Sequence, residues 1–118
     1  MSNVEFRYDL KGRDKVVIQM RVQGGATTQM ELNAAQVSVV IRGLANLRSR
    51  MSEDVPSEIP ENQPIEAVLN PSWRTGVHEQ GLALALRDPG HGWLSFLLPP
   101  EEAAGLGRFL IDNTTPQA

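Results

Sequence analysis

The sequence contains no cysteine, and only two of its 118 residues are histidine. Disulfide bonds, thiolate metal sites and cysteine nucleophiles are therefore excluded. No apolar run approaches the roughly 18 residues that cross a bilayer. The N-terminal stretch MSNVEFRYDLKGRDK also has no apolar core of the kind found in secretory signals. We expect a cytoplasmic protein without a membrane partner.

Positive charge is also scarce, with 11 Lys and Arg against 14 Asp and Glu and a net charge of −3. Nucleic-acid binding depends on Lys and Arg that neutralise phosphates, and the sequence has neither a basic run nor a helix-turn-helix pattern. We therefore expect no nucleic-acid partner. The strong preference for Arg over Lys, together with many Ala and Gly residues, is typical of a GC-rich bacterial genome.

The hydrophobic content of 41% and charged content of 21% are those of a globular chain. Its length fits one domain, which we expect to span residues 1–118. Residues 16–44 resemble residues 82–110 in their apolar pattern, with Met20 over Leu86 and Arg21 over Arg87. This similarity predicts an internal duplication of one β-β-β-α unit. The alternative is that any strand–turn–strand–helix unit resembles any other.

The first unit, about residues 3–51, contains three alternating segments typical of half-buried strands. The first two pair if their apolar residues share a face, which places Val4, Phe6, Tyr8 and Leu10 opposite Val22, Met20, Ile18 and Val16. The same rule predicts pairs in the next hairpin between Val22 and Thr28, Met20 and Met30, and Ile18 and Leu32. Residues 24–26 then form the connection.

The second unit, about residues 65–112, follows the same plan. Trp73, Thr75 and Val77 can oppose Leu86, Leu84 and Leu82, and Trp73 is expected to anchor the core. In the last hairpin the rule pairs Leu86 with Phe96 and Leu84 with Leu98. Residues 90–92 then form a three-residue loop, in which Gly92 can take the left-handed conformation that ends such loops.

Each unit is expected to end in a helix. Asn33 is a suitable N-cap for the first helix, and Pro99-Pro100-Glu101-Glu102 suits the start of the second. Both helices carry an apolar stripe: Val37, Val40, Ile41, Leu44, Leu47 and Met51 in the first, and Ala103, Leu106 and Leu110 in the second. An acidic, proline-rich linker is predicted at residues 52–64 and a frayed tail at residues 113–118. We predict an α+β fold, with antiparallel strands of two β-β-β-α units carrying both helices on one face. The two units could share one continuous sheet or form two packed layers.

The second face of this sheet is the main candidate for a binding site. If the helices cover the face of Ile18 and Leu84, six residues of the second unit point outward, and they include a Trp, a Leu, two Ala and an Arg. An apolar patch of this kind usually marks an interface, and Trp and Arg are common at interface hot spots. The predicted interface consists of Ala83, Ala85, Arg87, Trp93 and Leu97. Cover from within the chain and another protein partner are the alternatives to a homodimer.

The two histidines, His78 and His91, fall in the two predicted turns of the second unit. Either could act as a general base near Glu79 or Asp88, although polar turns collect such residues without any catalytic role. The two turns lie at opposite ends of a three-stranded meander, which argues against a shared metal site. The sequence has no phosphate loop, nucleophile elbow or zinc motif. We expect no metal and no cofactor.

These observations favour a small, non-catalytic binding or adaptor protein that self-associates through an apolar sheet face. The alternative is a small enzyme or small-molecule-binding protein that uses His78 or His91 near Arg87. The alternative requires a concave pocket around one of the histidines.

Overall fold

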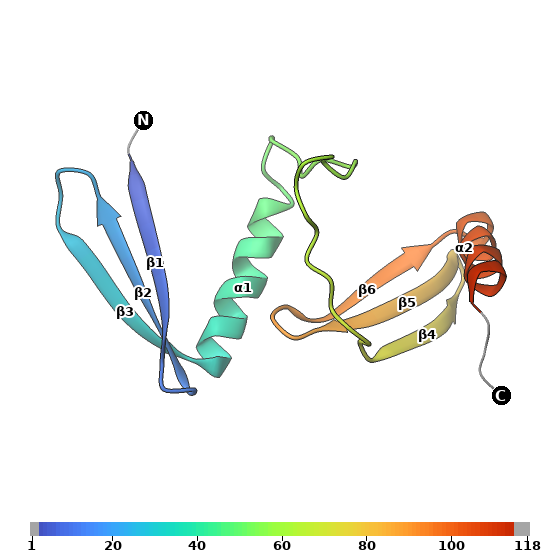
Figure 1. Cartoon of the computed structure of the whole chain (residues 1–118), viewed down its shortest axis with the longest axis horizontal. Helices are drawn as coiled ribbons and strands as arrows, with labels where there is room; N and C mark the ends of the chain where they lie inside the picture. The colour runs from blue at the N-terminus through green and yellow to red at the C-terminus, as the bar shows by residue number, and fades with distance from the viewer. Residues whose placement is uncertain (1–2, 115–118) are drawn as a thin grey trace. The chain divides into compact units, whose positions relative to one another are not determined.

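The computed structural model describes residues 3–114 and contains two β-β-β-α units (Figure 1). The chain divides into the compact units Met1–Ile59 and Pro60–Ala118, which we describe separately as unit 1 and unit 2. The predicted α+β class and antiparallel pairing are confirmed. The strands form two three-stranded sheets, one in each unit, and not one continuous sheet. Within each unit, short turns connect the consecutive strands of the sheet.

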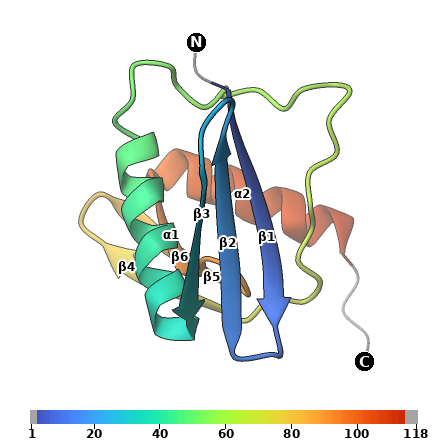
Figure 2. The ribbon, with the colours of Figure 1, turned by 90° about the vertical axis from the view of Figure 1, so that its left-hand side faces the viewer.

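Sheet A of unit 1 consists of β1 (Val4–Lys11), β2 (Lys15–Val22) and β3 (Thr27–Asn33), which lie side by side in that order (Figure 2). The β1–β2 register is as predicted, with Val4 opposite Val22. The predicted β2–β3 register is wrong by two residues. Ile18 lies opposite Met30 because the connection is longer than expected. Val22 still pairs with β1, and its carbonyl accepts a 2.9 Å hydrogen bond from the Gly25 N–H in a turn with Gly24 at φ +77°.

Sheet B of unit 2 consists of β4 (Trp73–His78), β5 (Gly81–Asp88) and β6 (Gly92–Leu98), again in sequence order. The β4–β5 register is as predicted, with Trp73 opposite Leu86. The predicted β5–β6 register is wrong by two residues, since Leu86 lies opposite Leu94. Asp88 pairs with Gly92, so the connecting loop is 89–91. Gly92 has the expected left-handed backbone, with φ +84°.

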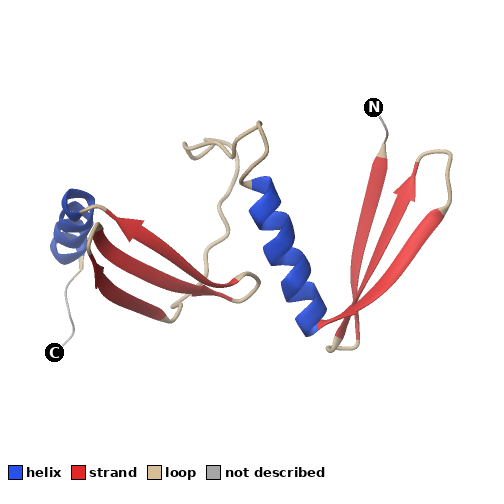
Figure 3. Cartoon of the chain, turned by 180° about the vertical axis from the view of Figure 1, so that it is seen from behind, coloured by secondary structure: helices blue, strands red, loops and turns tan. Residues whose placement is uncertain are grey.

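Helix α1 (Ala34–Arg48) begins directly after β3. The predicted cap is confirmed, because Asn33 Oδ1 accepts from the Gln36 N–H while Gln36 Oε1 accepts from the Asn33 N–H, each at 2.9 Å. Met51 lies beyond the helix, so the predicted apolar stripe is shorter than expected. From its first turn, α1 diverges from sheet A (Figures 1 and 3). A strand that passes into a helix without a connecting residue leaves no loop to fold the helix back onto the sheet.

Helix α2 (Pro100–Asn113) follows β6 after Pro99, which is the N-cap, and Glu101 and Glu102 lie in its first turn as predicted. Asn113 was expected in the tail but belongs to the helix, where its Nδ2 donates to the Phe109 carbonyl at 2.9 Å. The rest of the predicted tail from residue 115 onward lies outside the described residues. Within residues 3–114, no helix is long and apolar enough to cross a membrane.

The segment between α1 and β4, residues 49–72, contains neither helix nor strand (Figure 3, tan). It includes the predicted linker at residues 52–64 and extends beyond it at both ends. Among residues 3–114 there is no buried side chain in either unit. Each unit therefore has a defined sheet and helix but leaves its apolar side chains accessible.

Candidate functional site

The five predicted interface residues lie on one face of sheet B, which we call the Trp93 face. Ala83, Ala85 and Arg87 alternate along β5, and cross-strand pairing places Leu97 opposite Ala83 and Trp93 opposite Arg87. Trp93 is 51% exposed and Leu97 is 43% exposed. The structure therefore brings the predicted residues together on neighbouring strands. The two alanines leave a shallow surface between the larger side chains.

The opposite side of sheet B is also open, which the sequence analysis did not foresee. We call it the Leu84 face, and it consists of Trp73, Val77, Leu82, Leu84, Leu86, Leu94, Phe96 and Leu98. Trp73 is 65% exposed and Phe96 is 53% exposed, so α2 does not cover them. The prediction that Trp73 anchors the core is therefore wrong for unit 2. The apolar alternation of the strands predicted this face. It was not identified as a binding surface because the helix was expected to cover it.

Unit 1 has a related apolar groove between sheet A and α1. Its floor is the sheet face that carries Phe6, Tyr8, Val16, Ile18, Met30 and Leu32, which we call the Ile18 face. Its wall is α1, through Val37, Val40, Ile41 and Leu44. The groove has a volume of about 440 Å³ and exists because α1 diverges from the sheet. The rings of Phe6 and Tyr8 stack along its floor, with centroids 6.3 Å apart.

The two histidines lie in the turns where the sequence placed them, at opposite ends of sheet B. His78 Nδ1 accepts a 3.1 Å hydrogen bond from the Gln80 N–H in the β4–β5 turn. His91 Nδ1 lies 3.0 Å from Asp88 Oδ2 in the β5–β6 turn. No side-chain hydrogen bond of the described residues joins Arg87 to either histidine. Each imidazole thus interacts with its own turn.

Asp88 organises the β5–β6 turn. Its Oδ2 accepts hydrogen bonds from the backbone N–H groups of Gly90 at 2.9 Å and His91 at 2.7 Å. The backbone hydrogen bond from His91, followed by the interaction with its side chain, lowers the pKa of the Asp88 carboxyl. These bonds stabilise the carboxylate and the loop together. A structural role in the hairpin thus explains this acid–imidazole pair.

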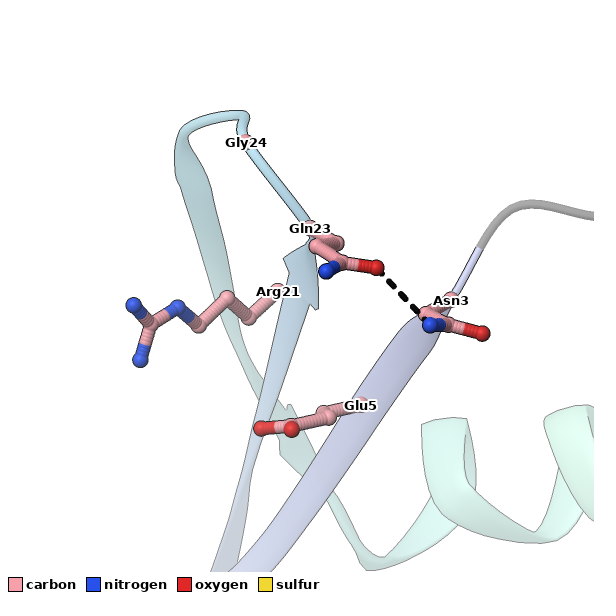
Figure 4. Close-up of a pocket in the computed structure, with 5 residues that line it drawn as sticks. All are labelled: Asn3, Glu5, Arg21, Gln23 and Gly24. Atoms are coloured by element: carbon pink, nitrogen blue, oxygen red, sulfur yellow. Dashed lines mark hydrogen bonds between the residues drawn. The ribbon is translucent and has the colours of Figure 1, made fainter.

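A polar pocket lies at the end of sheet A where β1 begins and has a volume of about 300 Å³ (Figure 4). Asn3, Glu5, Arg21, Gln23 and Gly24 line it. Asn3 Nδ2 donates to Gln23 Oε1 at 2.8 Å, and Glu5 lies opposite Arg21 in the β1–β2 ladder. All these side chains are exposed. The pocket combines charges of both signs in contact with solvent.

No group of three or more His, Asp or Glu side chains close enough to hold a metal ion occurs within residues 3–114. The apolar faces of the two sheets and the groove beside α1 are the candidate binding surfaces.

The chain matches no protein-family model, no curated protein and no solved structure. The class that its fold defines is an α+β protein with two β-β-β-α units and open apolar sheet faces.

Proposed function

We propose that this protein is a non-catalytic binding or adaptor protein that self-associates through an apolar sheet face, with the Trp93 face as the interface. The exposure of Trp93 and Leu97 on neighbouring positions of one surface is the observation that carries this proposal. Burying an apolar side chain such as these contributes roughly 1.5–3 kcal/mol, so a two-fold contact between such faces is favourable. Arg87, opposite Trp93, adds a residue type that is enriched at interface hot spots.

The test is sedimentation equilibrium on the wild type and on a double variant, Trp93→Asp with Leu97→Asp. We expect a wild-type dimer and a folded monomeric variant. The matched control is Val55→Asp with Leu69→Asp, which also adds two carboxylates at exposed apolar positions but in the irregular segment. The control should remain dimeric. A wild type that stays monomeric at high concentration would contradict self-association.

Three further features belong to this proposal. The two units have the same order of elements, and their central strands are both eight residues long, which supports a duplication of one β-β-β-α unit. We also propose that residues 1–118 act as one domain, with both helices on the same face of the assembled sheets. Finally, we propose that the protein is bacterial and is located in the cytoplasm.

A further inference from the structure

The Ile18 face of unit 1 and the Leu84 face of unit 2 are both apolar and both open. We propose that these two faces cover each other between two copies of the chain. The Ile18 face of one copy packs on the Leu84 face of the second, and the reverse contact forms at the same time. This inference rests on the self-association in the proposed function, although it uses a different surface from the Trp93 face.

The accessible surface of the chain provides the first argument. The chain has a mass of 13.0 kDa and exposes 11068 Å². Two separate compact units of half this mass would together expose only about 7,700 Å² by the usual scaling of surface with mass. The difference is about 3,400 Å². Since a stable dimer of standard size needs about 800 Å² from each partner, roughly a quarter of this difference is enough.

Charge complementarity favours pairing of unit 1 with unit 2 over pairing of like units. Residues 4–48 carry seven Lys and Arg and four Asp and Glu, a net charge of +3. Residues 73–113 carry three Arg and five Asp and Glu, a net charge of −2. The helices beside the two faces show the same contrast. Helix α1 carries Arg42 and Arg48 without an acidic residue, while α2 carries three acidic residues and Arg108. Like units would repel, and unlike units attract.

The composition of the connecting segment favours contact between copies. Residues 52–72 contain four prolines and five acidic residues and no Lys or Arg. Proline-rich linkers are semi-rigid spacers, and linkers with charge of one sign repel themselves and extend. A linker of this composition favours pairing of the exposed faces with a second copy. Reciprocal exchange of this kind is a low-cost route to a closed two-fold dimer.

The shapes of the two faces also fit. The groove beside α1 is a concave apolar volume of about 440 Å³. The Leu84 face presents the aromatic rings of Trp73 and Phe96, each more than half exposed. A large aromatic side chain inserted into an apolar pocket is the usual anchor of a protein interface. In the proposed dimer, these rings of one copy enter the groove of the other.

The experiment is complementation between two variants of the full chain. The first variant, Tyr8→Asp with Met30→Asp, alters only the Ile18 face, and the second, Trp73→Asp with Phe96→Asp, alters only the Leu84 face. Each variant alone has no intact reciprocal contact, so it should dimerise more weakly than the wild type, through the Trp93 face alone. An equimolar mixture retains one intact contact, between the unchanged unit 1 of the second variant and the unchanged unit 2 of the first. We expect a mixed dimer that is tighter than the dimer of either variant alone, measured with a fluorescent label on one variant.

The outcomes separate this inference from the proposed function. Two results overturn the reciprocal contact: a variant that dimerises as tightly as the wild type, or a mixed dimer that is no tighter than the dimer of either variant alone. Either result leaves the Trp93 face to be judged by its own variant. A mixed dimer tighter than the dimer of either variant alone supports the inference whether or not Trp93→Asp with Leu97→Asp dissociates the protein. A monomeric wild type overturns both.

A second measurement requires no substitution. Because the paired units carry opposite net charges, salt should weaken the reciprocal contact by screening. We expect the dissociation constant of the wild-type dimer to rise several-fold between 50 mM and 500 mM NaCl, because salt screens the attraction between the oppositely charged units. A dissociation constant that is unchanged or that falls would contradict unlike-unit pairing, since like units would be relieved of repulsion by salt.

Discussion

The carboxylate of Asp88 lies 3.0 Å from Nδ1 of His91 and accepts a 2.7 Å hydrogen bond from the backbone N–H of the same residue. It also accepts from the Gly90 N–H. One side chain thus satisfies two backbone donors of the β5–β6 loop and orients the imidazole at its tip. The side-chain oxygen of Asp acts here as in an Asx-turn, which stabilises a tight reversal of the chain.

This arrangement predicts a specific pH dependence. The interactions with His91 lower the pKa of Asp88 in the folded protein. The resulting stabilisation is complete above the ordinary Asp pKa of about 4 and is lost as the pH falls through the lower, folded-state value. Asp88→Asn keeps a side-chain oxygen for the backbone donors but removes the ionisation. Its melting temperature should lie a few degrees below that of the wild type at pH 7.

The difference should shrink toward zero as the pH falls below 4, as measured by circular dichroism across pH 2.5–7. Asp54→Asn, in the irregular segment, is the matched control and should follow the wild type throughout. A constant gap between the wild type and Asp88→Asn at every pH would show that the charge of Asp88 does not matter.

The same side chain shows why part of the fold could not be predicted. The rule that apolar residues of paired strands share a face is satisfied by every register shifted by two residues, because side chains alternate with a period of two. It therefore assigned the faces of all six strands but gave the wrong partner for Leu86. The turn decides between the allowed registers, and the bonds from Asp88 fix the loop at residues 89–91. By contrast, the patterns of Val4–Val22 and Trp73–Leu86 gave the right register directly.

The candidate site was predicted in part for a related reason. Alternation placed Trp93 and Leu97 on one face with Ala83 and Arg87, as the structure shows. It could not show whether the other face is covered, because cover depends on the path of the chain after each sheet. The apolar stripe of α1 predicted a helix packed on the sheet. The direct passage from Asn33 into Ala34 instead leads α1 away, and the Ile18 face remains open.

Gly81 on β5 and Gly76 on β4 lie in neighbouring strands of sheet B. We expect substitution by alanine to destabilise the protein at Gly81 and to stabilise it at Gly76. Gly81 has φ +147°, and a Cβ there would lie 1.8 Å from the Leu98 carbonyl oxygen. Because that atom belongs to the backbone, β6 would have to move, and we expect Gly81→Ala to lower the free energy of unfolding by at least about 2–3 kcal/mol. A Cβ at Gly76 meets nothing within 4 Å. Gly76→Ala should therefore raise stability by about 0.5 kcal/mol, since alanine loses less backbone entropy on folding.

Urea denaturation of both variants provides the comparison. The prediction concerns the difference between them, because both change the same residue type in the same sheet. Equal effects of the two substitutions would mean that the close approach of Gly81 to Leu98 is absent in solution.

The capping box at Asn33 predicts a measurable contribution to α1. Asn33→Ala removes the acceptor for the Gln36 N–H and should lower the free energy of unfolding by about 1 kcal/mol. Asn33→Asp retains a side-chain oxygen and adds a negative charge at the helix N-terminus, so it should match or exceed the wild type. Far-ultraviolet circular dichroism during denaturation measures both effects. A loss in Asn33→Asp as large as that in Asn33→Ala would show that the cap hydrogen bond does not stabilise the helix.

Glu31 on β3 interacts with two lysines of sheet A, Lys11 on β1 and Lys15 on β2. We expect Lys11 to lower the pKa of Glu31 more than Lys15 does. Its Oε1 is 2.6 Å from Lys11 Nζ, while its Oε2 is 3.9 Å from Lys15 Nζ. The hydrogen bond and charge of Lys11 lower the pKa of Glu31, and the effect of Lys15 is smaller. Lys11→Met should therefore raise this pKa most of the way to its ordinary value, whereas Lys15→Met should raise it only slightly.

Carbon-detected NMR titration of the Glu31 side chain measures the pKa in both variants. Since the folded-state value is lowered, the stabilisation from this pair is present above the ordinary Glu pKa of about 4.3 and disappears as the pH falls through the folded value. All three side chains are exposed to water, so salt should screen the interaction. Added NaCl should raise the pKa of Glu31 in the wild type and have little effect in Lys11→Met. A larger shift in Lys15→Met than in Lys11→Met would reverse the assignment, because the shorter contact would then not be the stronger one.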